Sequence, residues 1–403
     1  MIAPRRLLIC VVLGMSAASA ARAGEGGVEL IGVAKISGSA RDKSGLGGLY
    51  TNAKGESIPA NLAGSYGSSI SYTGKGELYY CPNDRGFGDG STASVCRLQI
   101  VELKVDARAK RVGAKLVETR LLTDEQGRNF NGLAANFIGS DPNKNYRFDP
   151  EGVRVGKDGS LFVSDEYGPS IWQFDASGKR VKTLRVPSKF LIAELSADEK
   201  VETARNTSGR VTNKGMEALA ITPDGKMLLG AMQSPLIQDG GRQGTNVRLL
   251  ALEIATGATR EYVYALPKHG LGLSEILAID ADRFIVLERD GKGGSEAKHK
   301  RLVKIDLRGA TDVSDVGNKL HTGLPLAGLP EGVKAVARTE WLDLLDPRFG
   351  LAGASFPEKV EGVAWGPDLA DGRKLLVVSC DNDLNPRQDV VFWAFAVDKS
   401  ELE

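Results

Sequence analysis

One pattern recurs along this 403-residue chain and restricts its fold more than any other feature. The clearest copy, residues 149–168, contains an acid, alternating apolar residues, an Asp-Gly turn, a second alternating run and two more acids. Alternating apolar residues on both sides of such a turn predict a β-hairpin. The two ends of an antiparallel hairpin lie side by side, so Glu151 is expected next to Asp165 and Glu166.

The same order of features returns at unequal spacing along the chain. Three further copies carry the first glutamate, one has Ser68 and Ser69 in its place, and a fragment from Ser44 resembles a sixth copy. Apart from the first copy and the fragment, these copies are residues 213–233, 273–290, 359–383 and 66–86. Two more strand-like runs follow several copies, and four-stranded units repeated radially are β-propeller blades. We therefore predict an all-β chain that forms a single β-propeller of about six four-stranded blades, within a range of five to seven. A β-sandwich is the alternative.

Two segments do not follow this repeat and are expected to be insertions between strands. Residues 189–205 are polar and compatible with a helix. Residues 309–356 are long and mixed in character, and residues 340–345 within them are expected to form one or two helical turns.

The N-terminus has the pattern of an export signal. Arg5 and Arg6 precede a short apolar run, and small residues follow up to Ala23. This pattern predicts a signal peptide over residues 1–23, cleaved after Ala23, and a propeller over residues 24–403. No later segment approaches the roughly 20 apolar residues of a membrane-spanning helix. We expect a periplasmic or secreted protein without membrane insertion.

The charge balance restricts the possible binding partners, and the cysteine content restricts the possible disulfides. Without the signal peptide the chain has 49 basic and 51 acidic residues, so no basic excess indicates nucleic acid binding. We expect a monomer that binds a small molecule. Three cysteines remain, and in an oxidising compartment they form either a disulfide between Cys81 and Cys96 with one thiol left over, or three buried thiols.

The repeated acids are expected to meet at one face of the propeller. Equivalent ends of the inner strands converge around the axis, which places an inner set of glutamates there: Glu151, Glu217, Glu275 and Glu361. A second set would lie just outside it: Asp84, Asp165, Glu166, Glu288, Asp381 and Asp383. Such an all-oxygen cluster suits Ca²⁺, and the histidines are not spaced as a zinc-ligand pair. Alternatively, the glutamates cap the inner strands and have only a structural role.

Several of these stretches resemble a known family. FDPEGVRVGKDGSLFVSDEYG, NKGMEALAITPDG, FIVLERD and KVEGVAWGPD are similar to the phytase-like family, described as having esterase-like activity of phytase. The resemblance covers about residues 44–383. It implies an exported β-propeller that hydrolyses a phosphate ester or a related ester.

A more distant resemblance to calcium-dependent β-propeller phytases implies a mechanism. Bound Ca²⁺ would activate water and neutralise substrate phosphates. The catalytic carboxylates would be Glu151, Glu217 and Glu361, and basic residues would clamp the phosphate. Those basic residues are Arg85, Lys214 and Arg289.

Two other functions remain open. One is a non-catalytic propeller that binds a ligand or a protein through the same face. The other is a lactonase-like propeller hydrolase with a calcium ion in its channel. A serine hydrolase is disfavoured, because the chain has no G-x-S-x-G sequence.

Overall fold

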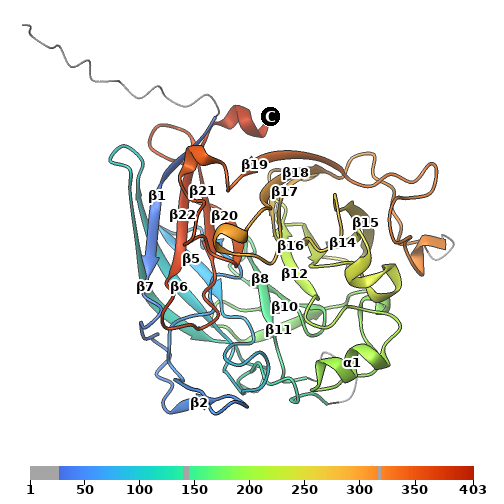
Figure 1. The fold of residues 1–403 in the computed structure, drawn as a ribbon, viewed down its shortest axis with the longest axis horizontal. Helices are drawn as coiled ribbons and strands as arrows, with labels where there is room; N and C mark the ends of the chain where they lie inside the picture. The colour runs from blue at the N-terminus through green and yellow to red at the C-terminus, as the bar shows by residue number, and fades with distance from the viewer. Residues whose placement is uncertain (1–26, 139–144, 316–318) are drawn as a thin grey trace, which may run out of the picture.

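The computed structural model describes residues 27–138, 145–315 and 319–403. This part of the chain forms five four-stranded antiparallel sheets and one two-stranded sheet. The innermost strands of the five sheets contact one another in a closed ring: β4, β8, β12, β16 and β20. Figure 1 shows the inner strands β8, β12, β16 and β20 near the centre and β7, β11, β15 and β19 towards the periphery. The chain is therefore an all-β propeller with five blades.

The strands of each blade run outwards from the centre in chain order, except in the last blade. The first blade contains β4 (Ser71–Tyr72), β5 (Leu78–Pro82), β6 (Arg97–Asp106) and β7 (Arg111–Leu121). The second contains β8 (Pro150–Val155), β9 (Leu161–Asp165), β10 (Ser170–Phe174) and β11 (Arg180–Leu184). The third contains β12 (Met216–Ile221), β13 (Met227–Met232), β14 (Asn246–Glu253) and β15 (Thr259–Ala265). The fourth contains β16 (Gly272–Ala278), β17 (Arg283–Arg289), β18 (Lys300–Asp306) and β19 (Ala337–Asp343). The fifth contains β20 (Val360–Trp365), β21 (Lys374–Cys380), β22 (Val390–Val397) and β1 (Val28–Ile36).

The fifth blade closes the ring with strands from both ends of the described chain. Strand β1 pairs antiparallel with β22, from Val28 opposite Val397 to Ile36 opposite Val390. The outermost strand of this blade therefore comes from the N-terminal side, and the other three come from the C-terminal side.

The structure has five blades, the lower end of the predicted range, and not the six that were expected. The fragment that begins at Ser44 forms a two-stranded hairpin, β2 (Leu49–Thr51) with β3 (Ser57–Pro59), and not a sixth blade. Because this hairpin has only two short strands, it cannot bury an apolar face as a four-stranded blade does. The predicted signal peptide lies outside the described residues. No helix in the described residues is long and apolar enough to cross a membrane.

The predicted hairpin over residues 149–168 is present as β8 and β9. Gly159 closes its turn with a positive φ of 81°, a conformation that glycine adopts without strain. The pairing register shifts between Pro150 and Val153, so a β-bulge contains Glu151. Bulges recur at the same place in β12, β16 and β20. A bulge re-aims its extra residue, and in three blades that residue is a glutamate.

The apolar core lies between neighbouring blades. Its largest cluster contains buried residues from the second, third and fourth blades. A separate aromatic cluster packs behind the start of β8, where the Phe148 and Trp172 rings stack at 4.3 Å. Phe148 directly precedes Asp149, so this packing fixes the entrance to the inner strand. The three described cysteines are buried free thiols, each in a different apolar cluster: Cys81, Cys96 and Cys380.

The two insertions differ in how well their structure was predicted. The first contains a 3₁₀ turn, η2 (Ser188–Phe190), and the helix α1 (Glu199–Arg205), as its polar sequence indicated. The expected helical turns at residues 340–345 are wrong, because β19 occupies most of this stretch. Leu342 is buried opposite Leu302 of β18, so pairing with the blade determines the conformation. The other 3₁₀ turns are η3 (Ile237–Asp239), η4 (Gly241–Gln243), η5 (Gly294–Glu296), η6 (Lys319–His321), η7 (Pro347–Phe349) and η8 (Lys399–Leu402).

Candidate functional site

An acidic pocket of about 150 Å³ lies where the bulged ends of β8, β12 and β20 meet. We call it the acidic pocket. Eight acidic and four basic residues line it, together with Ser68, Asn213 and Gln233. The acids are Asp84, Asp89, Asp149, Glu151, Glu166, Glu217, Glu361 and Asp383. The basic residues are Arg85, Lys214, Arg289 and Lys359.

Three of these carboxylates form a group that could hold a metal ion. Asp149 directly precedes β8, Glu151 lies in it, and Glu166 directly follows β9. One carboxylate oxygen from each lies within 4.8 Å of the others. All three side chains are buried, and burial holds the pKa of Asp149 and of Glu151 well above its ordinary value. Neighbouring acids raise the pKa of Glu151 further.

This group lacks the partners that buried carboxylates usually have. Across the described residues, Glu151 and Glu166 accept no side-chain hydrogen bond and have no ion pair within 4.0 Å. Asp149 accepts a 2.7 Å hydrogen bond from the Arg85 backbone, but its second oxygen has no hydrogen-bond partner. All three residues line the pocket, and several of their carboxylate oxygens have no partner in the protein. Such a group of free oxygen ligands fits a hard cation such as Ca²⁺.

A second acidic group already contains a cation of its own. Oxygens of Asp84, Asp381 and Asp383 also lie within 4.8 Å of one another. The ammonium group of Lys359 lies 3.8 Å from Asp84 and 3.7 Å from Asp381, and it also pairs with Asp383. Although burial opposes its charge, Glu361 and these acids raise the pKa of Lys359 well above the ordinary value. A metal is therefore not needed to neutralise this group.

Glu217 is the carboxyl best suited to proton transfer. Its side chain accepts a 2.5 Å hydrogen bond from the Gln233 amide, and Lys214 donates to the other end of that amide. Burial, followed by the charges of Glu166 and Glu361, raises the pKa of Glu217 well above its ordinary value. A carboxyl whose pKa is raised in this way can serve as a general acid.

Glu361 is compensated by Arg289. Their side chains form an ion pair at 2.5 Å, and Arg289 also donates a 2.6 Å hydrogen bond to Ser274. Ser274 occupies the bulge of β16, the position that Glu151, Glu217 and Glu361 occupy in their own strands.

Glu275 therefore lies one residue further along β16 than expected. It is buried in the channel, where it forms a 2.8 Å ion pair with Arg154 and accepts a hydrogen bond from Ser69. Arg154 also donates to backbone carbonyls of three neighbouring inner strands or their flanks, at Ile70, Ile276 and Val363. We call this pair the channel plug. It does not line the acidic pocket.

Two other predicted ligands also lie outside both acidic groups. Glu288 of β17 is fully buried and bonded to Tyr264, His299 and Arg338. Asp165 accepts hydrogen bonds from three backbone amides, at Asp149, Tyr167 and Gly168, and so fixes the turn after β9. Burial still raises the pKa of Asp165 to about 6.

Sequence reasoning missed several pocket residues. Asp149 and Lys359 belong to the recurring stretches and each lies two residues before its glutamate, but the repeat draws attention only to the glutamates. Asp89 and Asn213 were missed as well, and like the predicted Asp383 they line the pocket with positive φ angles of 50° and 55°, against 51° for Asp383. Such conformations are uncommon outside glycine and concentrate at functional sites.

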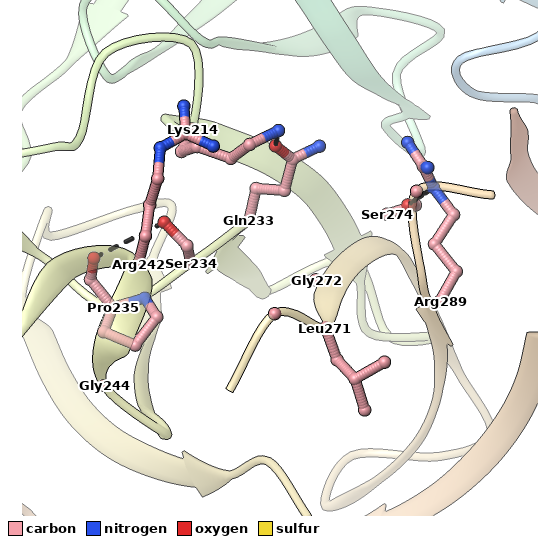
Figure 2. Close-up of a pocket in the computed structure, with 12 residues that line it drawn as sticks. Lys214, Gln233, Ser234, Pro235, Arg242, Gly244, Leu271, Gly272, Ser274 and Arg289 are labelled. Carbon is pink, nitrogen blue, oxygen red and sulfur yellow. Dashed lines mark hydrogen bonds between the residues drawn. The ribbon is translucent and has the colours of Figure 1, made fainter. Parts of the chain in front are cut away.

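A second cavity of about 290 Å³ adjoins the acidic pocket and shares Lys214, Gln233 and Arg289 with it. We call it the cationic compartment. Figure 2 shows Lys214 and Arg242 on one side of it, and Arg289 with Ser274 on the other. The combined site thus has an acidic part and a basic part.

A family model described as "Esterase-like activity of phytase" matches residues 64–384, more than half of the chain. The chain belongs to the phytase-like family. The match includes the inner strands of all five blades of this phytase-like protein, and with them the acidic pocket. The resemblance inferred from the recurring stretches is confirmed.

The individual proteins and structures compared with this phytase-like protein have low sequence identity to it. A protein of Arthroderma benhamiae described as an uncharacterized secreted protein is 28% identical over 341 residues. The match covers 68% of this chain and 65% of that relative's length. Among solved structures, a gluconolactonase from Xanthomonas campestris is 10% identical, with a TM-score of 0.37 over 83% of this chain and 86% of its own. A β-1,3-galactosidase of glycoside hydrolase family 43 is 9% identical, with a TM-score of 0.38 over 86% and 93%. Similarity at this level does not transfer an activity.

Proposed function

We propose that this phytase-like protein is an exported hydrolase that uses Ca²⁺ to cleave a phosphate ester or a related ester in the acidic pocket. The observation that carries the proposal is the group formed by Asp149, Glu151 and Glu166. Its buried carboxylates lie together without a cation of the protein beside Glu151 or Glu166. In water-poor surroundings such a group is strongly destabilised unless it binds a cation or protons.

Asp149, Glu151 and Glu166 would hold the ion. A calcium ion bound there would polarise an ester oxygen and favour the ionisation of water. Arg85 would act as a positioning residue, because its backbone amide and guanidinium both approach Asp149. The guanidinium also lies within ion-pair distance of Asp89 and Glu199, which leaves it less free to bind substrate.

Two basic residues and one acid would act on the substrate. Lys214 and Arg289 line the pocket and would neutralise the negative charge of the ester. Glu217 would donate a proton to the departing oxygen, because burial and the neighbouring acids raise its pKa and so favour its protonated form. Glu361 would keep the Arg289 guanidinium in place through their ion pair.

The test is turnover of p-nitrophenyl phosphate by the purified mature protein, with Ca²⁺ or with a chelator. We expect turnover that requires Ca²⁺ and is lost in Glu166→Gln. Absence of turnover between pH 5 and 9 would contradict phosphomonoester hydrolysis. Turnover of a lactone without turnover of the phosphate ester would assign the site to lactone hydrolysis instead. Calcium-dependent thermal stabilisation without any turnover would indicate a binding protein.

Export is part of the proposal. Two observations support it: the signal-like sequence of residues 1–23 and the description of the fungal relative as secreted. N-terminal sequencing of the protein from a native host fraction would test it, and we expect the mature chain to begin at Gly24.

A further inference from the structure

The cationic compartment has a charge opposite to that of the pocket it adjoins. Lys214, Arg242 and Arg289 line it, and no acidic side chain is among its described lining residues. Figure 2 shows the three basic side chains arranged around the same opening. An anion that reached this compartment would therefore meet donors from two sides.

Two of the three cations have no acidic partner. Within the described ranges, no carboxylate lies within 4.0 Å of the Lys214 ammonium or the Arg242 guanidinium. Lys214 donates to Gln233, and Arg242 donates to the Thr212 carbonyl at 3.3 Å. Burial lowers the pKa of Lys214, the charges of Glu166 and Glu217 oppose that effect, and repulsion by Arg289 and Arg242 adds to it. A bound anion would relieve this repulsion.

The rest of the wall is mainly apolar. Leu271 and Pro235 line it together with several glycines, and the Ser274 hydroxyl lies beside Arg289. Its volume of about 290 Å³ is just below the range of small-molecule sites, about 300–1,000 Å³. Such a compartment suits a short carbon skeleton that carries a carboxylate or a phosphate.

We propose that the cationic compartment binds a second, non-reacting anionic group of the substrate. The inference rests on the proposed function, because the reacting ester would enter the acidic pocket next to it. Lys214 and Arg289 border both cavities, so one small molecule could extend across them. Arg242 lines only the cationic compartment, which makes it the residue that selects esters with two anionic groups.

Metal-free protein allows the compartment to be tested alone. Without a cation, the excess of acids in the acidic pocket repels anions, so an anion that binds must use the cationic compartment. Chelator-treated protein is titrated calorimetrically with inorganic phosphate and, separately, with acetate. We expect binding of at least one, and the tighter one identifies the group as phosphate or carboxylate.

The matched variants are Arg242→Gln and Arg260→Gln. Arg242→Gln should weaken anion binding at least about tenfold, since it removes charge-assisted hydrogen bonds. Arg260 is exposed on β15 of the same blade and does not line the compartment, so Arg260→Gln should bind as the unchanged protein does. Absence of anion binding, or equal binding by Arg242→Gln, would overturn the inference.

A substrate comparison separates this inference from the proposed function. With Ca²⁺ present, kcat/KM for 4-carboxyphenyl phosphate is compared with that for phenyl phosphate. A preference for the ester with the added carboxylate that Arg242→Gln abolishes supports the inference, and equal values in the unchanged protein contradict it. If neither ester is cleaved, the proposed function fails, while the calorimetric titration still decides whether the compartment binds anions.

Discussion

Glu217 has the residue-scale role that can be tested most directly by a single substitution. In Glu217→Gln the side chain keeps its shape and can still hydrogen-bond to Gln233, but it can no longer donate the proton. General acid catalysis contributes about 10²–10⁴-fold, so we expect kcat to fall at least about 100-fold. Calcium affinity should be unchanged, because Glu217 is outside the three-carboxylate group. Steady-state kinetics and a calcium titration measure the two effects, and activity close to that of the unchanged protein would contradict this role.

Lys359 determines how many metal ions the pocket takes. Because its ammonium already neutralises Asp84, Asp381 and Asp383, we expect one calcium ion per chain in the unchanged protein. In Lys359→Met those acids lose their cation and should bind a second ion. Elemental analysis after gel filtration in Ca²⁺ counts the ions, and Lys292→Met at an exposed site is the control. Two ions in the unchanged protein, or one in Lys359→Met, would refute this assignment.

At the residue scale, the sequence identified the glutamates of the pocket and could not identify their partners. Glu151, Glu217 and Glu361 stand out because they recur at the same place in a repeat. Which carboxylate is paired depends on residues far away along the chain. Arg289 neutralises Glu361 across 72 positions, and Arg154 pairs with Glu275 across more than a hundred. No local pattern contains that information.

The inner-strand bulges are the elements that build the site. Gly152 directly follows Glu151 at the bulge of β8, and a Cβ atom there would lie 2.6 Å from the backbone nitrogen of Leu219 on β12. Neighbouring inner strands thus approach more closely than any larger side chain allows. We expect Gly152→Ala to lower the free energy of unfolding by about 1–3 kcal/mol, because backbone must move to admit the methyl group.

A matched glycine provides the control for this prediction. Gly113 lies on the outer strand β7, and a Cβ atom there has no neighbour within 4 Å. Gly113→Ala should therefore leave stability unchanged or raise it slightly. Denaturant unfolding of both variants measures the difference. Equal stability of Gly152→Ala and the unchanged protein would show that the inner strands can separate at little cost.

The bulges also explain why one predicted position was misplaced. The sequence pattern aligns Glu275 with the other glutamates, whereas the pairing register places Ser274 in the bulge of β16. A shift of the register by one residue moves a side chain from one face of the sheet to the other. Bulges add a residue without changing the alternation on either side, so the sequence alone does not show which residue is extra.

At the scale of the whole molecule, the channel plug ties the five blades together across the axis. Burial raises the pKa of Glu275 from 4.5 to about 7 and outweighs the opposing effects of Arg154 and Ser69. Between these values the folded state holds a proton that the unfolded chain has released. The contribution of Glu275 to stability therefore falls as the pH rises from about 4.5 to 7.

Comparison with Glu275→Gln isolates this effect from the other buried acids. The variant cannot ionise at residue 275, so its stability relative to the unchanged protein should increase as the pH rises through that range. Denaturant unfolding at pH 5 and at pH 8 measures the two differences. A difference that is constant with pH, or that changes in the opposite direction, would contradict the pKa assigned to Glu275.

The propeller could be predicted from the sequence, and the number of blades could not. Four of the blades carry the full hairpin pattern, and the β4–β5 blade keeps it in part. The short β2–β3 hairpin resembles a blade core in its turn and short strand-like runs, but it lacks the first acid and has no outer strands. Strand β1 completes the last blade, and its sequence does not indicate that its partner lies more than 350 residues later in the chain.

The central claim is that Asp149, Glu151 and Glu166 bind calcium, and a calorimetric calcium titration of chelator-treated protein tests it most directly. The account predicts one site in the unchanged protein and an affinity at least about 100-fold weaker in Glu151→Gln and in Glu166→Gln. Glu275→Gln should keep the affinity, because Glu275 belongs to the channel plug. Calcium binding that survives both Glu151→Gln and Glu166→Gln, or no binding by the unchanged protein, would contradict the account.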